Sequence, residues 1–126
     1  MTWRLDHVQL AIPAGAEELC DGFYLGLLGF TREEKPPALA GRGGRWYRRD
    51  GALLHLGVED PFVPAAKAHP ALVVDDYTAL VARLAAAGVE VRSDESIAGT
   101  TRCHVSDPVG NRVEIVMGLD SEETGM

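Results

Sequence analysis

Residues 67–76, KAHPALVVDD, and residues 5–13, LDHVQLAIP, decide the fold, because both place a histidine directly before a short apolar run. Runs of this length and pattern are typical of β-strands with one buried face. A chain of 126 residues is long enough for one well-packed domain and too short for two ordinary ones. The repeated pattern therefore predicts a single domain, residues 1–126, made of two similar halves.

The same order of further elements follows each of these strands. Leu19, Phe23 and Leu27 have the i, i+4, i+8 spacing of an amphipathic helix, and residues 76–88 repeat that periodicity. Three short strands, separated by glycine-rich, proline-rich or Asp-Gly turns, follow each helix. The sequence thus predicts an α+β fold of two βαβββ modules, over about residues 4–59 and about residues 68–118. We expect them to form a curved mixed sheet, a half-barrel, with both helices on its outer face.

Four polar residues take matched places in the two modules: His7 and His55 in module one, and His69 and Glu114 in module two. Each lies opposite an apolar strand face, because successive side chains alternate across a sheet. In a half-barrel with external helices, all four would converge on the concave face. Three imidazoles and a carboxylate suit a divalent transition ion such as Zn, Ni, Co, Mn or Fe.

Two alternatives to this metal site stay open. Taken singly, each histidine has the ordinary interpretation of a structural or surface imidazole. Without a metal, Glu114 would need another partner, such as Arg112 or a protonated histidine, because an unpaired buried charge is costly.

The composition excludes several classes of function. A net charge of −7 disfavours nucleic-acid binding, which needs a cationic surface, and no apolar run approaches the roughly 20 residues that cross a bilayer. Cys20 and Cys103 form no CxxC pair, and no secretory signal pattern is recognised. We expect a cytoplasmic protein with a small-molecule substrate or ligand and no nucleic-acid or membrane partner. Cys103 is expected to be a small buried hydrophobic residue.

Five segments resemble the vicinal oxygen chelate superfamily: DHVQLAIP, FYLGLLGF, AHPALVVDD, LAAAGVEV and SDPVGNRVEIV. The last looks like its turn-and-strand signature around a ligand glutamate, and the resemblance covers nearly the whole chain. The superfamily includes glyoxalase I, fosfomycin resistance proteins, extradiol dioxygenases and bleomycin resistance proteins. The resemblance implies that a bound metal chelates adjacent oxygens of the substrate and stabilises the negative charge that develops there.

The resemblance also implies roles for particular residues. The ligands of metal-using relatives map residue by residue onto His7, His55, His69 and Glu114. Glyoxalase I commonly has a glutamate where His55 stands, so its pair of carboxylates is incomplete here. Glu114 is the expected catalytic residue, as the base, with a water held by Gln9 as the alternative.

Four residues are expected to contact the substrate: Gln9, Trp46, Arg102, which would orient an anionic group, and His104, which would line the cavity. The leading interpretation is a metal-dependent lyase or isomerase of glyoxalase type that acts on an oxygenated small molecule. One alternative is a bleomycin resistance-like module that sequesters a cationic ligand on surfaces such as Trp46. Another is a fosfomycin-type thiol transferase. In each case we expect a homodimer, with half-barrels formed within one chain or by exchange of modules.

Overall fold

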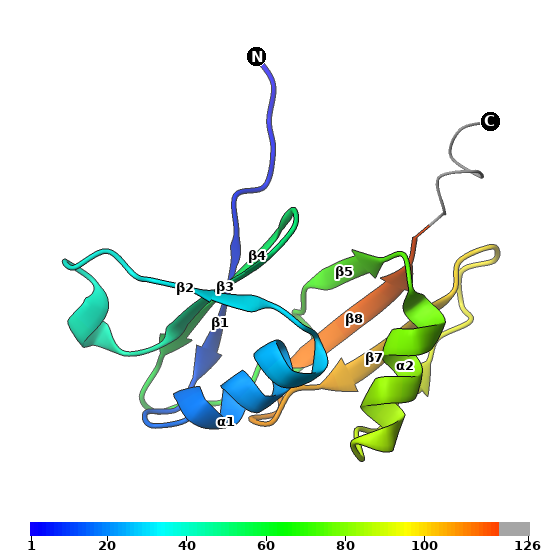
Figure 1. The fold of residues 1–126 in the computed structure, drawn as a ribbon. Coiled ribbons are helices and arrows are strands. Elements are labelled where there is room, and N and C mark those ends of the chain that lie inside the picture. The colour runs from blue at the N-terminus through cyan, green and yellow to red at the C-terminus, as the bar shows by residue number, and fades with distance from the viewer. Residues whose placement is uncertain (119–126) are drawn as a thin grey trace. The chain divides into compact units, whose positions relative to one another are not determined.

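The computed structural model describes residues 1–118, which divide into two compact units. Unit one holds Met1–Pro64 together with Pro108–Asn111, and unit two holds Ala65–Asp107 and the segment that begins at Arg112. Each unit contains one four-stranded sheet with its own helix (Figure 1). No helix in residues 1–118 is long and apolar enough to cross a membrane.

Unit one has the order β1 Val8–Ile12, α1 Glu17–Asp21, β2 Thr31–Glu33, β3 Arg45–Arg49 and β4 Ala52–Val58. Gly22–Leu27 continues helix α1 with a wider, π-type turn, and Ala40–Arg42 is a short 3-10 turn between β2 and β3. The strand order is β1-β4-β3-β2, with β1 parallel to β4 and the other pairs antiparallel. The last strand of the unit therefore lies inside the sheet.

Unit two repeats this plan with β5 Ala71–Val74, α2 Tyr77–Ala86, β6 Arg92–Ser93, β7 Arg102–Ser106 and β8 Arg112–Met117. Its strand order is β5-β8-β7-β6, again with a parallel first pair. Helix α2 packs along β8 (Figure 1). The prediction of an α+β fold with two βαβββ modules is confirmed.

The apolar stripe of the first helix differs from the prediction by one position. Leu19 is 58% exposed, whereas Cys20, Phe23, Tyr24 and Leu28 are buried. Cys20, Tyr24 and Leu28 keep the i, i+4, i+8 spacing of an amphipathic helix, and Phe23 shares their buried face, so Cys20 takes the place predicted for Leu19. The helix continues as a π-type turn, in which the amide of Leu28 donates to the carbonyl of Phe23 at 2.9 Å. In helix α2, the predicted stripe is correct, since Tyr77 and Leu84 are its buried residues.

The cores follow the alternation of the strands. Tyr47, Leu54 and Leu56 are buried in unit one, and Cys103, Val105, Val113 and Ile115 are buried in unit two. Both cysteines are free and buried, as expected for Cys103 as a small core residue. With these residues turned into the core, the polar residues between them share the opposite face of each sheet.

Candidate metal site

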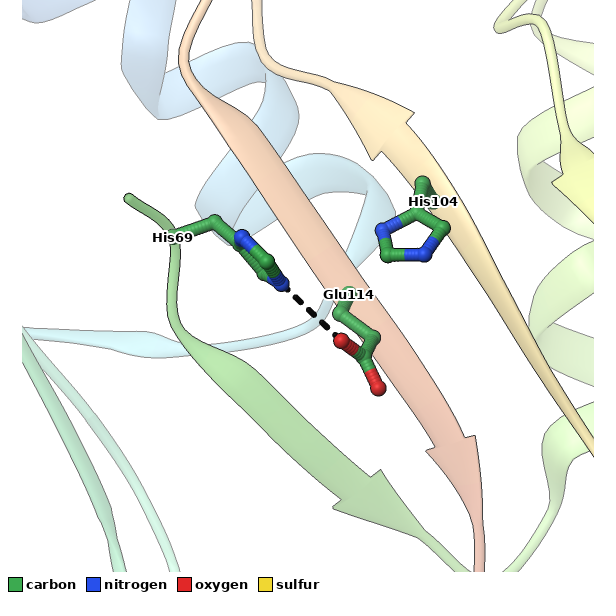
Figure 2. A group of neighbouring side chains, drawn as sticks. All are labelled: His69, His104 and Glu114. Carbon is green, nitrogen blue, oxygen red and sulfur yellow. Dashed lines mark hydrogen bonds and ion pairs between the residues drawn. The ribbon is translucent and has the colours of Figure 1, made fainter. Parts of the chain in front are cut away.

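Unit two brings three metal-ligating side chains together: His69, His104 and Glu114 (Figure 2). Glu114 lies on the interior strand β8, directly opposite His104 on β7 in the strand register. His69 precedes β5, which pairs with β8 on its other side. One potential ligand atom from each residue lies within 4.8 Å of the other two.

Both carboxylate oxygens of Glu114 have partners. Oε1 lies 2.9 Å from Nε2 of His69, and Oε2 accepts a hydrogen bond from Nη1 of Arg102 at 3.1 Å. Burial opposes ionisation of this carboxyl group, but the contacts with His69 and Arg102 prevail and lower the pKa of Glu114 below its ordinary value. Glu114 is therefore a buried carboxylate that stays charged.

The surroundings of His69 test whether a metal fits. Its Nδ1 lies 2.7 Å from the carbonyl oxygen of Lys67, which can only accept, so Nδ1 carries a proton. In a neutral imidazole, Nε2 then has no proton and presents a lone pair. It faces Oε1 of Glu114, which is also an acceptor, at 2.9 Å. Two such acceptors need a proton or a cation between them. Cis ligands about 2.1 Å from one ion would be about 3 Å apart, so the pair fits a metal.

His104 has a complementary arrangement. Its Nε2 lies 3.0 Å from Oδ2 of Asp94, whose carboxylate accepts the proton on that nitrogen. Nδ1 of His104 is buried and has no hydrogen-bond partner among the described residues. A carboxylate on one ring nitrogen commonly orients the other nitrogen toward a metal. The donor set of unit two therefore fits a divalent transition ion.

Arg102 and Asp94 link the members of this group. Nη2 of Arg102 forms an ion pair with Oδ2 of Asp94 at 2.9 Å and donates to Oγ of Ser96 at 2.9 Å. The hydroxyl and amide of Ser96 both donate to Oδ1 of Asp94, at 2.6 and 3.0 Å. The hydroxyl of Ser96 is the largest cause that lowers the pKa of Asp94, and its amide, His104 and Arg102 add to the effect. Asp94 therefore stays ionised as the common acceptor for His104 and Arg102.

In unit one, three rings form a stack. The ring centroids of Trp46 and His55 are 4.1 Å apart, with an interplanar angle of 7°. Those of His7 and His55 are 4.0 Å apart, with an interplanar angle of 19°. Burial, followed by the neighbouring His7, lowers the pKa of His55, so this imidazole is neutral at pH 7. Nδ1 of His7 lies 2.8 Å from Oδ2 of Asp6. Gln9 is next to His55 in the strand register.

The structure thus groups the predicted residues within each unit. In unit one, Gln9, His55 and Trp46 share a sheet and His7, directly before β1, stacks on His55, while His69, Glu114, His104 and Arg102 share the network in unit two. His104, predicted to contact the substrate, falls among the candidate ligands. It faces Glu114 in the register as Trp46 faces His55, so the repeat itself carried a signal for this position.

Two features were missed by the sequence analysis. Glu114 pairs with Arg102 rather than with Arg112, because Arg102 is its diagonal neighbour across β7 and β8 and has a side chain long enough to reach. Asp94 lies in the loop after β6, outside the strands whose alternation selected the other candidates. No pattern in the sequence therefore pointed to it.

Known proteins share this fold. The family model described as the Glyoxalase/Bleomycin resistance protein/Dioxygenase superfamily matches residues 4–115. The chain belongs to this superfamily. Divalent metals are frequent cofactors of the superfamily. No protein with a curated function matches the chain.

Three solved structures illustrate the relationship. A protein from Bacillus anthracis described as a glyoxalase family protein is 38% identical, with a TM-score of 0.90 over 94% of this chain and 98% of that chain. An antibiotic binding protein from a Streptomyces species is 25% identical, with a TM-score of 0.67 over 94% and 100%. A fosfomycin resistance protein from Listeria monocytogenes, 15% identical with a TM-score of 0.73 over 97% and 98%, shares the fold.

Proposed function

We propose that this superfamily member is a metal-dependent lyase or isomerase of glyoxalase type. Its substrate would be an oxygenated small molecule that binds the metal through two adjacent oxygens. The observation that carries the proposal is the group of His69, His104 and Glu114, whose ligand atoms lie within 4.8 Å of one another. When bound, a divalent ion would polarise the substrate oxygens and stabilise negative charge on them.

The residues of unit two have defined parts in this proposal. His69 donates from Nδ1 to the carbonyl of Lys67 and offers Nε2, and His104 is held by Asp94 through Nε2 and offers Nδ1. Glu114 offers Oε1 while Arg102 holds Oε2. His7 and His55 stay proposed ligands on the grounds of their matched positions in the repeat.

Glu114 is also the proposed catalytic base. Its lowered pKa keeps it ionised at neutral pH, so that it can accept a proton from a carbon or oxygen of the substrate. To do so, Oε1 or Oε2 must give up its contact with His69 or Arg102. Water held by Gln9 is the alternative proton acceptor.

The first experiment is the metal content of protein purified without a metal-affinity tag, measured by inductively coupled plasma mass spectrometry. We expect near-stoichiometric transition metal in the wild type and its loss in the His69→Ala variant. Metal-loaded protein is then screened with 2-oxoaldehyde–thiol adducts, and with fosfomycin and Mn²⁺ for the thiol-transferase alternative. A wild type that stays metal-free after incubation with Zn²⁺, Ni²⁺ and Mn²⁺ would refute the proposal.

A second candidate function, sequestration of a small molecule, is favoured by the ring stack of His7, His55 and Trp46. His7 is partly exposed at the end of this stack, and the chain has a net charge of −7, which suits a flat cationic ligand. The antibiotic-binding relative from Streptomyces gives this candidate further support. Calorimetric titration with metallated bleomycin tests it: tight binding that survives a chelator would favour sequestration over catalysis.

We also propose that the protein works as a homodimer in the cytoplasm. Trp3 and Leu5 are 87% and 77% exposed, and such apolar side chains in an extended segment suit burial against a second copy. The free, buried cysteines suit a reducing compartment. Light scattering after size exclusion tests the dimer, and a monomeric mass at micromolar concentration would contradict it.

A further inference from the structure

We infer that the substrate is a singly charged anion, a 2-oxo or 2-hydroxy carboxylate, and that Arg102 selects for its charge. This inference rests on the proposed metal site and adds the chemical class of the ligand. It comes from a feature that the metal site does not explain, a guanidinium beside a candidate metal-ligating carboxylate.

Arg102 is held in a fixed orientation beside the candidate ligands. Its side chain is 15% exposed. Nη2 lies between Asp94 and Ser96, and Nη1 donates to Glu114 at 3.1 Å. Since a guanidinium keeps its charge in proteins, this cation is permanent. Asp94, which also holds His104, therefore couples the position of Arg102 to that of a candidate ligand.

The guanidinium still has donors to offer. Of its five N–H groups, hydrogen bonds to Ser96 and Glu114 use two, and Nη2 also lies 2.9 Å from Oδ2 of Asp94. Nε is buried and has no hydrogen-bond partner among residues 1–118. A buried donor without an acceptor is unfavourable, so a bound ligand that supplies an oxygen would be stabilised here. The donors left for a ligand are Nε and the second hydrogen of Nη1, and each forms a stronger hydrogen bond to an ionised oxygen than to a neutral one.

The charge of the site points the same way. Glu114 and Asp94 are carboxylates and Arg102 is a cation, so with neutral imidazoles the network has one net negative charge. A divalent ion would change this to one net positive charge. A monoanion would neutralise the loaded site, whereas a neutral ligand would leave a partly buried cation uncompensated.

A matched pair of probes tests the inference. Pyruvate and butane-2,3-dione both present two adjacent oxygens and are of similar size, but only pyruvate is charged at pH 7. Their dissociation constants are measured by calorimetry on the full chain loaded with Mn²⁺. We expect wild type to bind pyruvate more tightly and Arg102→Gln to bind it about 10- to 100-fold more weakly, as for one charged hydrogen bond. Binding of the dione should change little.

Two further variants support the test. Arg102→Lys keeps the charge without the planar fork, so it should fold even if Arg102→Gln does not, and it should lose part of the preference for pyruvate. Arg83→Gln removes a cation from helix α2 of the same unit, outside this network, and should leave both affinities unchanged. Circular dichroism confirms that each variant is folded.

The outcomes separate this inference from the proposed function. If Mn²⁺ binds but wild type does not prefer pyruvate, or if substitutions of Arg102 weaken both probes equally, the inference is wrong and the metal site stands. If Mn²⁺ does not bind at all, the proposed function fails, and the inference fails with it because it requires the ion.

Discussion

At the scale of single residues, Asp94 shows how a loop carboxylate can set the chemistry of a site. Its two oxygens accept from Ser96, Arg102 and His104, so it orients one candidate ligand and one cation together. We predict that Asp94→Asn lowers the affinity for Zn²⁺ by about 10- to 100-fold, as is usual for loss of an acceptor behind a metal-ligating histidine.

Competition with a coloured chelator measures this change. Asp75→Asn is the matched control, because Asp75 is an exposed aspartate of the same unit whose partner is the amide of Asp76. Equal Zn²⁺ affinities for wild type and Asp94→Asn would show that His104 is not a ligand, or that Asp94 does not orient it.

The residues of the candidate site differ in how far the sequence could predict them. His55 and Glu114 stand at strand positions, and His69 lies two residues before β5, so a period of two was enough to select all three as candidates. Arg102 and Asp94 act through long side chains and a loop, whose reach depends on strand register and turn geometry. Strand order sets that register, and a short sequence does not determine it.

At the scale of elements, the repeat of strand, helix and strands could be predicted because hydrophobic periodicity reports which face is buried. The choice between Leu19 and Cys20 as the first buried position of the first helix could not, because both are apolar and adjacent, so periodicity alone fits either one. Tyr24, on the same face as Cys20, stacks on Tyr47 of β3 with ring centroids 5.2 Å apart, which is a tertiary contact that local spacing does not report. Local spacing is therefore compatible with a buried Leu19, which the structure exposes.

A hydrogen bond between Tyr47 on β3 and Asp21 on α1 supports a stability prediction. The hydroxyl of the fully buried Tyr47 donates to Oδ1 of Asp21 at 2.6 Å, and burial followed by this contact raises the pKa of Tyr47. We predict that Tyr47→Phe lowers the free energy of unfolding by about 1 to 3 kcal/mol, because a partly buried carboxylate, 23% exposed, loses a donor. Urea unfolding at pH 7 measures the change. Thr31→Ala on the exposed strand β2 should cost much less, and equal effects would argue against this account.

A pH dependence follows from the start of the same helix. Oε2 of Glu17 accepts the amide of Gly44 at 2.9 Å, and this backbone hydrogen bond is the main cause that lowers the pKa of Glu17 below 4.5. A lowered folded-state pKa stabilises the protein above about pH 4.5, and that stability is lost as the pH falls through the lowered value.

We therefore predict that Glu17→Gln is less stable than wild type at pH 7, by under about 1 kcal/mol for a partly exposed contact. The difference should shrink by pH 3. Thermal melts of both proteins at the two pH values measure it. Glu18→Gln, next to it in the helix, is the control, and a difference between Glu17→Gln and wild type that does not depend on pH would contradict the assignment.

At the scale of the whole molecule, duplication gives each unit the same row of positions with different chemistry. Gln9, His55 and Trp46 are neighbours in one sheet, where Ala71, Glu114 and His104 are neighbours in the other. In the first sheet, His55 and Trp46 stack on each other, whereas in the second, Glu114 and His104 contact charged or ionisable groups. The two sheets share the same strand order, and their chemistry differs because the side chains differ.

The last prediction asks whether His7 binds the same ion as His69. A ligand that binds only the folded state stabilises it by about 2.7 kcal/mol at 100 times its Kd, so Zn²⁺ should raise the melting temperature of the wild type. The shift should vanish in His69→Ala. Under the proposed set of ligands, His7→Ala also diminishes it, because His7 would donate to the same ion. Differential scanning fluorimetry with Zn²⁺ and with a chelator measures the three proteins. A full shift in His7→Ala would instead assign the ion to unit two, where His69, His104 and Glu114 already supply three ligands.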